Sequence, residues 1–320
     1  MGIGSVRGAG IILAVLSAST FGTAGAFGSS LIHAGWTPGA AVTTRVVVAA
    51  VVLTVPAVLQ MRGRWALLRR GRATMALFGL VAVAGAQLCY FNAVAHLSVG
   101  VALLLEYLGT LLVVGWLWLR HAQRPRRLTV AGGVLSILGL VLVLDLAGSH
   151  RLDPVGVLWG LGAAVGLAAY FVISAATHDP LPPLAMAWGG MMVGAVALVG
   201  LGIVGAVPWR ASMDDVRLLD HQVSWLVPVI GLSVVAAVFA YVAGINAARL
   251  LGAKVASFVG LTEVVFAVVF AWLLLGQVPA VVQLAGGALI IAGIVLVRVD
   301  ELRTPAAHAP LSPTPEMLRA

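Results

Sequence analysis

Two glutamates lie inside long apolar runs of this chain, and buried carboxylates are the first candidates for chemistry. Glu106 is the only charge in residues 101–119, VALLLEYLGTLLVVGWLWL, and Glu263 is the only charge in residues 255–275, VASFVGLTEVVFAVVFAWLLL. Burying a carboxylate is costly in lipid or in a dry protein core. Such a group can accept a proton, whereas a nearby cation holds it ionised. A structural carboxyl group that is hydrogen-bonded between helices is the alternative.

The two glutamates belong to an internal repeat. A shift of 154 positions superposes the two apolar runs, and it also matches further pairs: Asn92 with Asn246, Gln123 with Gln277, and Gly132 and Gly133 with Gly286 and Gly287. On this superposition Glu106 falls on Gly260, and Glu263 falls on Gly109. Three residues make about one helical turn, so we expect both carboxylates on the same face of equivalent helices.

Arg45 is the third charge that we expect at membrane depth. It could pair with Glu106, bind an anionic group of a solute, extend outward to the interface, or cap backbone carbonyls. We predict that Glu106, Glu263 and Arg45 form a proton and substrate pathway. We also predict a cavity lined by amides, aromatics and a hydroxyl, which suits a small amphipathic solute: Gln87, Tyr90, Asn92, Tyr241, Asn246 and Thr262. Hydrogen bonding between helices is the alternative role for each of these residues.

The elements that must position these residues are membrane spans. Hydrophobic residues make up 61% of the 320 residues and charged residues only 9%, against about 25% charged in soluble domains. The sequence predicts an all-α integral membrane protein with ten transmembrane helices: 8–32, 39–60, 74–97, 99–119, 128–147, 154–176, 184–207, 223–246, 253–275 and 280–299. We expect the most acidic connection, 209–221, to form a short surface helix.

Ten spans divide into two inverted five-helix repeats, because a half with an odd number of spans returns the chain to the membrane from the opposite side. We assign residues 1–147 to the first repeat, 148–299 to the second and 300–320 to a disordered, Pro-rich cytoplasmic tail. With both termini cytoplasmic, fifteen of the 19 Lys and Arg residues fall on the inner side. The alternative that the first span is a cleavable signal peptide would leave nine spans, so we expect it to be retained.

Several other classes of function lack support in the sequence. Gly200, Gly202 and Gly205 match a dinucleotide-binding pattern, but they lie inside an apolar span without a preceding strand. Cys89 is the only cysteine, and no metal-ligand or hydrolase motif is present in the sequence. The net charge of +8 comes from short basic tracts at the ends of spans, which indicates topology rather than nucleic-acid binding. We therefore expect no enzyme and no cofactor.

The chain resembles an EamA-type permease of the drug/metabolite transporter superfamily over about residues 8–299. Arg45 within TTRVVVAAVVL, the segment GVALLLEYLGTLLVVGWLWL from Gly100, and LTEVVFAVVFAWLLLGQ up to Gln277 carry the resemblance. The resemblance implies two repeats around a central cavity and a secondary carrier whose relatives export amino acids and other metabolites. Two positions depart from the family pattern. Thr110 stands where proline is common, which predicts a straighter fourth span, and Gln277 replaces a carboxylate near the outer surface.

We therefore expect a proton-coupled exporter of amino acids or related small metabolites in the inner cell membrane, with alternating access from rocking of the repeats. Multidrug efflux and metabolite exchange without proton coupling are alternatives within the same class. A non-transporting membrane scaffold is the alternative from another class. The expected partners are a small-molecule substrate, protons and the lipid bilayer, with a homodimer left open.

Overall fold

The computed structural model describes residues 3–97, 99–121, 126–143, 153–176, 181–219, 221–275 and 281–302. These residues are predominantly helical, in agreement with the predicted class. In chain order the elements are α1 (Ile3–His33), α2 (Pro38–Met61), α3 (Trp65–Arg70), α4 (Arg72–Leu77), η1 (Phe78–Gly85), α5 (Ala86–His96), α6 (Val99–Tyr107), α7 (Gly109–His121), α8 (Arg127–Val143), α9 (Pro154–Ser174), α10 (Pro183–Ile203), β1 (Val216–Leu218), β2 (His221–Val223), α11 (Leu226–Ile230), η2 (Gly231–Phe239), α12 (Ala240–Gly260), α13 (Thr262–Leu275) and α14 (Val281–Leu302).

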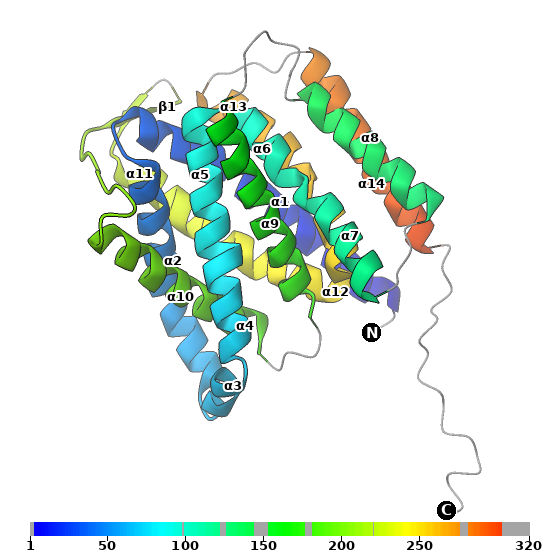
Figure 1. Ribbon diagram of the computed structural model, residues 1–320, viewed down its shortest axis with the longest axis horizontal. Helices are drawn as coiled ribbons and strands as arrows, with labels where there is room; N and C mark the ends of the chain where they lie inside the picture. Colours follow the sequence, from blue (N-terminus) through cyan, green and yellow to red (C-terminus); the bar gives the residue numbers. More distant parts are fainter. Residues whose placement is uncertain are drawn as a thin grey trace, which may run out of the picture.

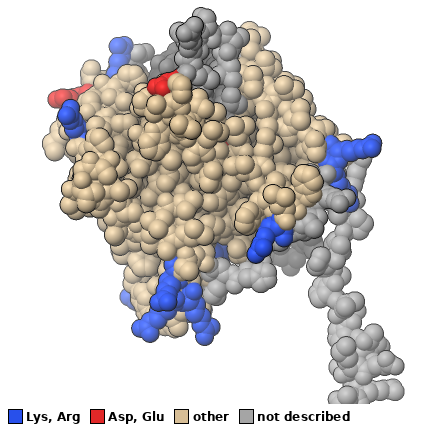
Figure 2. All heavy atoms as spheres, viewed as in Figure 1, with Lys and Arg blue, Asp and Glu red and all other residues tan. Residues whose placement is uncertain are grey.

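Within the described ranges, six helical stretches are long and apolar enough to cross a membrane: Arg7–His33, Pro38–Met61, Arg72–His96, Pro154–Ser174, Pro183–Ile203 and Leu226–Gly260. Shorter apolar helices occupy Arg127–Leu142, Thr262–Leu274 and Leu284–Val297. The chain is therefore a multi-pass membrane protein. The charged side chains agree with this assignment, because Figure 2 shows them at the lower and right-hand edges and at the upper left, with an uncharged surface between.

Two of the predicted spans are interrupted. The fourth is divided into α6 and α7 at Leu108, although Thr110 had predicted a straighter helix. The ninth is divided at Leu261, and its first part lies in α12, which comprises two helices joined at a non-helical residue, Gly252, where φ is +79°. A positive φ is accessible to glycine because it has no Cβ. Hydrophobicity predicted where these spans lie, but it carries no signal for a break inside an apolar run.

The helices pack side by side in a bundle (Figure 1). Helix α1 packs against α12 and α13, α2 packs against α10, and α5 packs against α9. Helices α8 and α14 pack against each other at one edge of the bundle. Glycine permits this contact, since a Cβ on Gly132 would lie 2.6 Å from the carbonyl oxygen of Gly293.

The connection between α10 and α11 contains two strands rather than the expected surface helix, so that expectation was wrong. Val216 pairs with Val223 and Leu218 with His221 in an antiparallel hairpin. Along β1 the burial alternates, with Val216 and Leu218 buried and Arg217 exposed between them. This period of two favours a strand over a helix. The connection also binds the turn before α2, because Trp36 Nε1 donates to the carbonyl of Ser212 at 2.6 Å.

Two π-helical segments lie within long apolar stretches. Segment η1 comprises Phe78–Gly85, and η2 comprises Gly231–Phe239. Shifting η1 by 154 positions places it on residues 232–239, which lie inside η2. A π-helix alters the i to i+4 hydrogen-bonding pattern and frequently marks a functional site. The shift that superposes the two apolar runs therefore also relates the two π-helical segments.

Candidate substrate cavity

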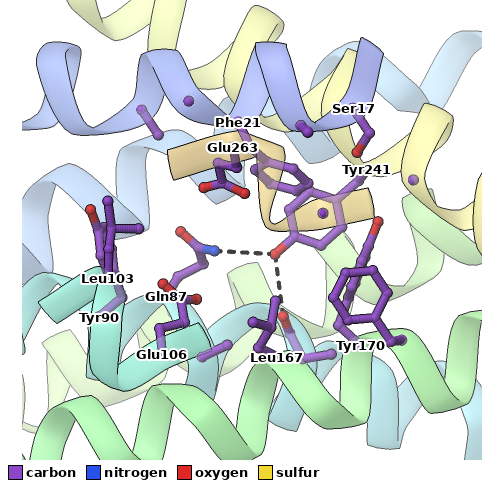
Figure 3. A pocket seen from close by; sticks show the side chains of 18 of the residues that line it. Ser17, Phe21, Gln87, Tyr90, Leu103, Glu106, Leu167, Tyr170, Tyr241 and Glu263 are labelled. Atoms are coloured by element: carbon purple, nitrogen blue, oxygen red, sulfur yellow. Dashed lines mark hydrogen bonds between the residues drawn. The ribbon is translucent and has the colours of Figure 1, made fainter. Parts of the chain in front are cut away.

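A central cavity brings together the three charges singled out from the sequence. Its lining includes Arg45 from α2, Glu106 from α6 and Glu263 from α13, with further residues from α1, η1, α5, α9 and α12. It contains about 850 Å³ of empty space, including the part open to the outside. Figure 3 shows Glu106, Gln87 and Glu263 directed into the same space. Residues far apart in sequence thus meet around one cavity.

Each carboxylate lies beside one helix break, one before its break and the other after its break. Glu106 is in the last turn of α6, just before the break at Leu108, whereas Glu263 is in the first turn of α13, just after the break at Leu261. Interrupted helices at membrane depth are tolerated where they line a cavity, and they commonly form the binding sites of carriers.

The hydrogen bonding of the carboxylates also differs. The Tyr107 hydroxyl donates to Glu263 Oε2 at 2.7 Å and lies 3.0 Å from the carbonyl oxygen of Gly260. Glu106 has no hydrogen-bond partner among the described residues. Its carboxyl group is therefore available to the cavity, whereas that of Glu263 is held by a neighbouring helix.

Arg45 is 2% exposed and is held by neutral groups. Its Nη1 donates to Gln87 Oε1, and its Nη2 donates to the carbonyl of Ala236 in η2. Within the described part of the chain it has no carboxylate within salt-bridge distance. Of the arrangements considered from the sequence, the structure shows carbonyl capping rather than a direct pair with Glu106 or outward extension. A guanidinium has five N–H donors, so the two described bonds leave donors for another acceptor.

A second buried side chain completes this network. Gln87 Nε2 donates to the Tyr241 hydroxyl at 3.4 Å, and the same hydroxyl donates to the carbonyl of Ala82 in η1 at 3.2 Å (Figure 3). Ala82 and Ala236 are equivalent positions under the 154-residue shift, as are Gln87 and Tyr241. The equivalent carbonyls of the two π-helical segments therefore accept hydrogen bonds from different donors.

Aromatic side chains also line the cavity, among them Phe21, Tyr170 and Tyr241. Phe21 of α1 lies edge to face with Tyr241, with ring centroids 5.1 Å apart. Tyr170 of α9 contacts Phe78, Phe171 and Tyr241. Packed rings provide a rigid, largely apolar wall beside the charged groups.

Three of the predicted lining residues lie elsewhere. Gln87, Tyr90 and Tyr241 line the cavity, whereas Asn92, Asn246 and Thr262 are not among its lining residues. The side-chain amides of Asn92 and Asn246 each donate to a carbonyl four residues earlier, both at 2.7 Å, and Thr262 Oγ1 donates to the carbonyl of Val259 at 2.7 Å. Polar groups in apolar helices are satisfied locally in this way. Gln123 and Gln277 lie outside the described residues.

The sequence did not single out Tyr107, Phe21 and Tyr170. Tyr107 follows Glu106 directly and falls on Leu261 in the repeat, so an unmatched polar aromatic residue beside a carboxylate was the available signal. Phe21 and Tyr170 carried no such signal, because an aromatic ring in an apolar helix is usually a packing residue. No group of three His, Cys, Asp or Glu residues that could hold a metal ion occurs within the described ranges.

This arrangement of interrupted helices around a charged central cavity is typical of a membrane carrier. The sequence pattern of the EamA-like transporter family matches residues 8–145 and again residues 154–299. The chain belongs to the EamA-like transporter family, and membership in a transporter family implies a carrier rather than an enzyme.

Two curated relatives come from Bacillus subtilis (strain 168). The chain is 30% identical to the protein named "Uncharacterized transporter YwfM" over 122 residues, which are 38% of this chain and 41% of that protein. It is 25% identical to "Uncharacterized transporter YdfC" over 167 residues, which are 51% of this chain and 50% of that protein. The matched stretches thus span at most half the length of these relatives.

A solved structure described only as "Crystal structure of protein" has the same fold. It superposes with a TM-score of 0.70 at 20% sequence identity, and the match covers 94% of this chain and 99% of that chain. At this identity the likeness concerns the fold alone.

Proposed function

We propose that the protein is a proton-coupled exporter of amino acids or related small zwitterionic metabolites. The observation that carries this proposal is the convergence of Arg45, Glu106 and Glu263 on one cavity in a member of a transporter family. A cationic and two acidic side chains offer partners for both ends of a zwitterion, and the adjacent rings of Phe21 and Tyr170 offer a surface for its apolar part.

The proposal includes the architecture of ten spans in two inverted five-helix repeats, residues 1–147 and 148–299. Three observations support it: the family pattern matches twice, the two π-helical segments are related by 154 positions, and the interruptions at Leu108 and Leu261 fall at nearly equivalent positions. We place both termini on the cytoplasmic side of the inner cell membrane. The exposed arginines around α3 support this orientation: Arg62, Arg64, Arg69, Arg70 and Arg72.

In the proposed cycle, a carboxyl group of Glu106 or Glu263 binds a proton from the outer side and releases it to the cytoplasm as substrate leaves the cell. The lack of a hydrogen-bond partner for Glu106 among the described residues supports a role in direct contact with substrate or proton. Rocking of the two repeats about the cavity would alternate its access between the two sides.

The first test compares metabolites inside and outside cells that express the wild type, the Glu106→Gln, Glu263→Gln double variant or an empty vector. Glutamine has nearly the same size as glutamate, but its amide group does not bind or release a proton at the pH values of the assay. An amino acid or related compound that accumulates outside only with the wild type supports the proposal. Asp215→Asn is the matched control, since it makes the same chemical change at an exposed loop residue. Membrane levels of all variants must match.

Proteoliposomes distinguish the alternatives. Purified protein that carries the identified metabolite alone is a transporter, whereas a scaffold would need a partner protein. Movement that is independent of an imposed pH gradient would favour an uncoupled exchanger. Transport of hydrophobic cations in place of the metabolite would favour multidrug efflux. Unchanged transport and unchanged pH dependence in the double variant would remove the proton role.

A further inference from the structure

The hydroxyl group of Tyr107 lies between two acceptors that belong to different helices. Tyr107 is the last residue of α6, and its side chain is 3% exposed. Its oxygen is 2.7 Å from Glu263 Oε2 in the first turn of α13 and 3.0 Å from the carbonyl oxygen of Gly260, the last residue of α12. A single side chain therefore connects the interruption between α6 and α7 to the interruption between α12 and α13.

A tyrosine hydroxyl has one hydrogen, so it can make only one strong donated bond at a time. When Glu263 is ionised, the carboxylate is the stronger acceptor, because hydrogen bonds to charged groups are shorter and stronger than those to neutral groups. The shorter of the two distances, to Glu263, agrees with this order.

Protonation of Glu263 reverses this arrangement. The neutral carboxylic acid has its own O–H group, which needs an acceptor, and the Tyr107 oxygen is within reach. The Tyr107 hydrogen is then free to bond to the Gly260 carbonyl. The chain of donors runs from Glu263 through Tyr107 to Gly260, and the only atom added is the proton on Glu263.

We propose that Tyr107 is a positioning residue that transmits the protonation state of Glu263 to the helix interruptions, by moving its hydroxyl hydrogen between Glu263 and the Gly260 carbonyl. With Glu263 ionised, the end of α6 is bound to α13. With Glu263 protonated, Tyr107 accepts from Glu263 and donates to Gly260, so the end of α6 is also bound to the end of α12.

Other charged and titratable groups surround this pair. Arg45 of α2, Tyr90 of α5, Glu106 of α6, Tyr170 of α9 and Tyr241 of α12 all line the same cavity as Glu263. Helix α1, which packs against α13, contributes only neutral side chains to that lining. Among the described residues only Tyr107 donates a hydrogen bond to Glu263, so its response can be separated from longer-range effects.

The inference rests on the proton role in the proposed function, and infrared spectroscopy tests it without a transport assay. The full-length protein in lipid nanodiscs is brought from high to low pH, and two bands are followed: the C=O stretch of protonated carboxyl groups and the C–O stretch of tyrosine, which depends on the hydrogen bonds of the hydroxyl. The chain has four tyrosines, so single Tyr→Phe variants assign the second band.

We expect a carboxyl band that appears on acidification and is lost in Glu263→Gln. We expect the tyrosine band to shift with it in the wild type, and this shift to be lost in both Glu263→Gln and Tyr107→Phe while it remains in Tyr170→Phe. Ser257→Ala is a further control, because the Ser257 hydroxyl donates only to the carbonyl of Lys254 in its own helix. Circular dichroism and gel filtration show whether the variants are folded.

The outcomes separate the two proposals. If the Glu263 band appears but the tyrosine band does not shift, or if the shift persists in Tyr107→Phe, the role of Tyr107 is wrong and the proton role stands. If no carboxyl band is lost in Glu263→Gln at any pH, the proton role of Glu263 fails and the inference fails with it. If both bands respond but no proton-coupled transport is found, the proposed function fails while the Tyr107 exchange holds.

Discussion

The stretch that comprises η1, α5 and α6 and the stretch that comprises η2, α12 and α13 share a backbone plan but carry different polar groups. Each begins with a π-helical segment and contains or borders a helix interruption, at Leu108 directly after α6 and at Leu261 between α12 and α13. The equivalent carbonyls of Ala82 and Ala236 accept from Tyr241 and Arg45, respectively. One glutamate precedes its interruption and the other follows it. The two stretches therefore share backbone features, whereas their hydrogen-bonding and charged side chains differ in type and position.

This difference has a physical reason. Side chains from both stretches enter one cavity, where two glutamates at equivalent positions would repel each other if both were ionised. Distributing an arginine, an amide, a tyrosine and two displaced glutamates gives each group a different neighbour. The comparison predicts that equivalent substitutions in the two stretches have unequal effects.

The largest expected effect follows Arg45→Met. It removes the charge from the cavity and leaves Gln87 and the Ala236 carbonyl without their donor. Loss of one partner of a buried charge-assisted interaction costs enough to reduce transport about 100-fold, and the unsatisfied acceptors should lower Tm by about 5 °C. Transport of the identified metabolite and thermal denaturation are the measurements. Arg62→Met, at an exposed position, is the matched control. Wild-type transport by Arg45→Met would contradict a role for this charge.

Gly109→Ala and Gly260→Ala compare the two interruptions directly. A Cβ on Gly109 would lie 2.5 Å from the backbone oxygen of Ala164, whereas a Cβ on Gly260 would lie 2.9 Å from the Phe171 ring. A ring can move and backbone cannot, so we expect Gly109→Ala to destabilise by about 2 kcal/mol. Gly260→Ala should be close to neutral, because the gain in helix propensity offsets the contact. Denaturation of both variants in the same detergent measures this. An equal decrease in the free energy of unfolding of the two variants would mean that the two interruptions are packed alike.

Tyr241→Phe tests the weaker of the two π-helix contacts. It removes the bonds to Gln87 and Ala82, which are 3.4 Å and 3.2 Å long and involve only neutral groups. Hydrogen bonds between helices in membranes contribute about 0.6 kcal/mol on average, so we expect a loss of about 1 kcal/mol and a smaller fall in Tm than for Arg45→Met. Tyr90→Phe is the control, since its hydroxyl has no hydrogen-bond partner in the described part of the chain. A fall in Tm as large as that of Arg45→Met would mean that the Tyr241 and Arg45 donors contribute equally to stability.

The smallest effect is expected for Asp153→Asn, which alters a surface contact between Asp153 and His96. The Val155 backbone N–H donates to Asp153 and lowers the pKa of this carboxyl group, and a hydrogen bond from His96 acts in the same direction. A carboxyl group whose pKa is lower in the folded state than in the unfolded state stabilises the folded protein at pH values above its unfolded-state pKa. This contribution is lost as the pH falls through the folded-state pKa. Asp153→Asn should therefore lower Tm by about 1 °C at pH 7, and less at low pH. A constant difference between pH 7 and pH 3 would contradict this origin.

The approximate positions of the spans follow from the sequence, because each apolar run has the length of the hydrocarbon core and only a helix satisfies its backbone there. The interruption at Leu261 was not predicted, since apolar composition carries no signal for it, whereas the break at Gly252 falls in the predicted connection between the eighth and ninth spans. The three charges of the cavity were found because a charge inside an apolar run is conspicuous. Asn92, Asn246 and Thr262 are not among the residues that line this cavity, and each donates a hydrogen bond to a carbonyl three or four residues earlier.

The sequence by itself determined that the chain is a helical membrane protein and that Arg45, Glu106 and Glu263 are charges inside apolar runs. Only the tertiary structure decided which groups these charges meet. Arg45 binds Gln87 and a π-helix carbonyl, Glu263 binds Tyr107, and Glu106 remains open to the cavity. Hydrophobicity fixes which residues lie in the membrane, whereas the choice of partner depends on helix packing and on backbone irregularities, which composition does not encode.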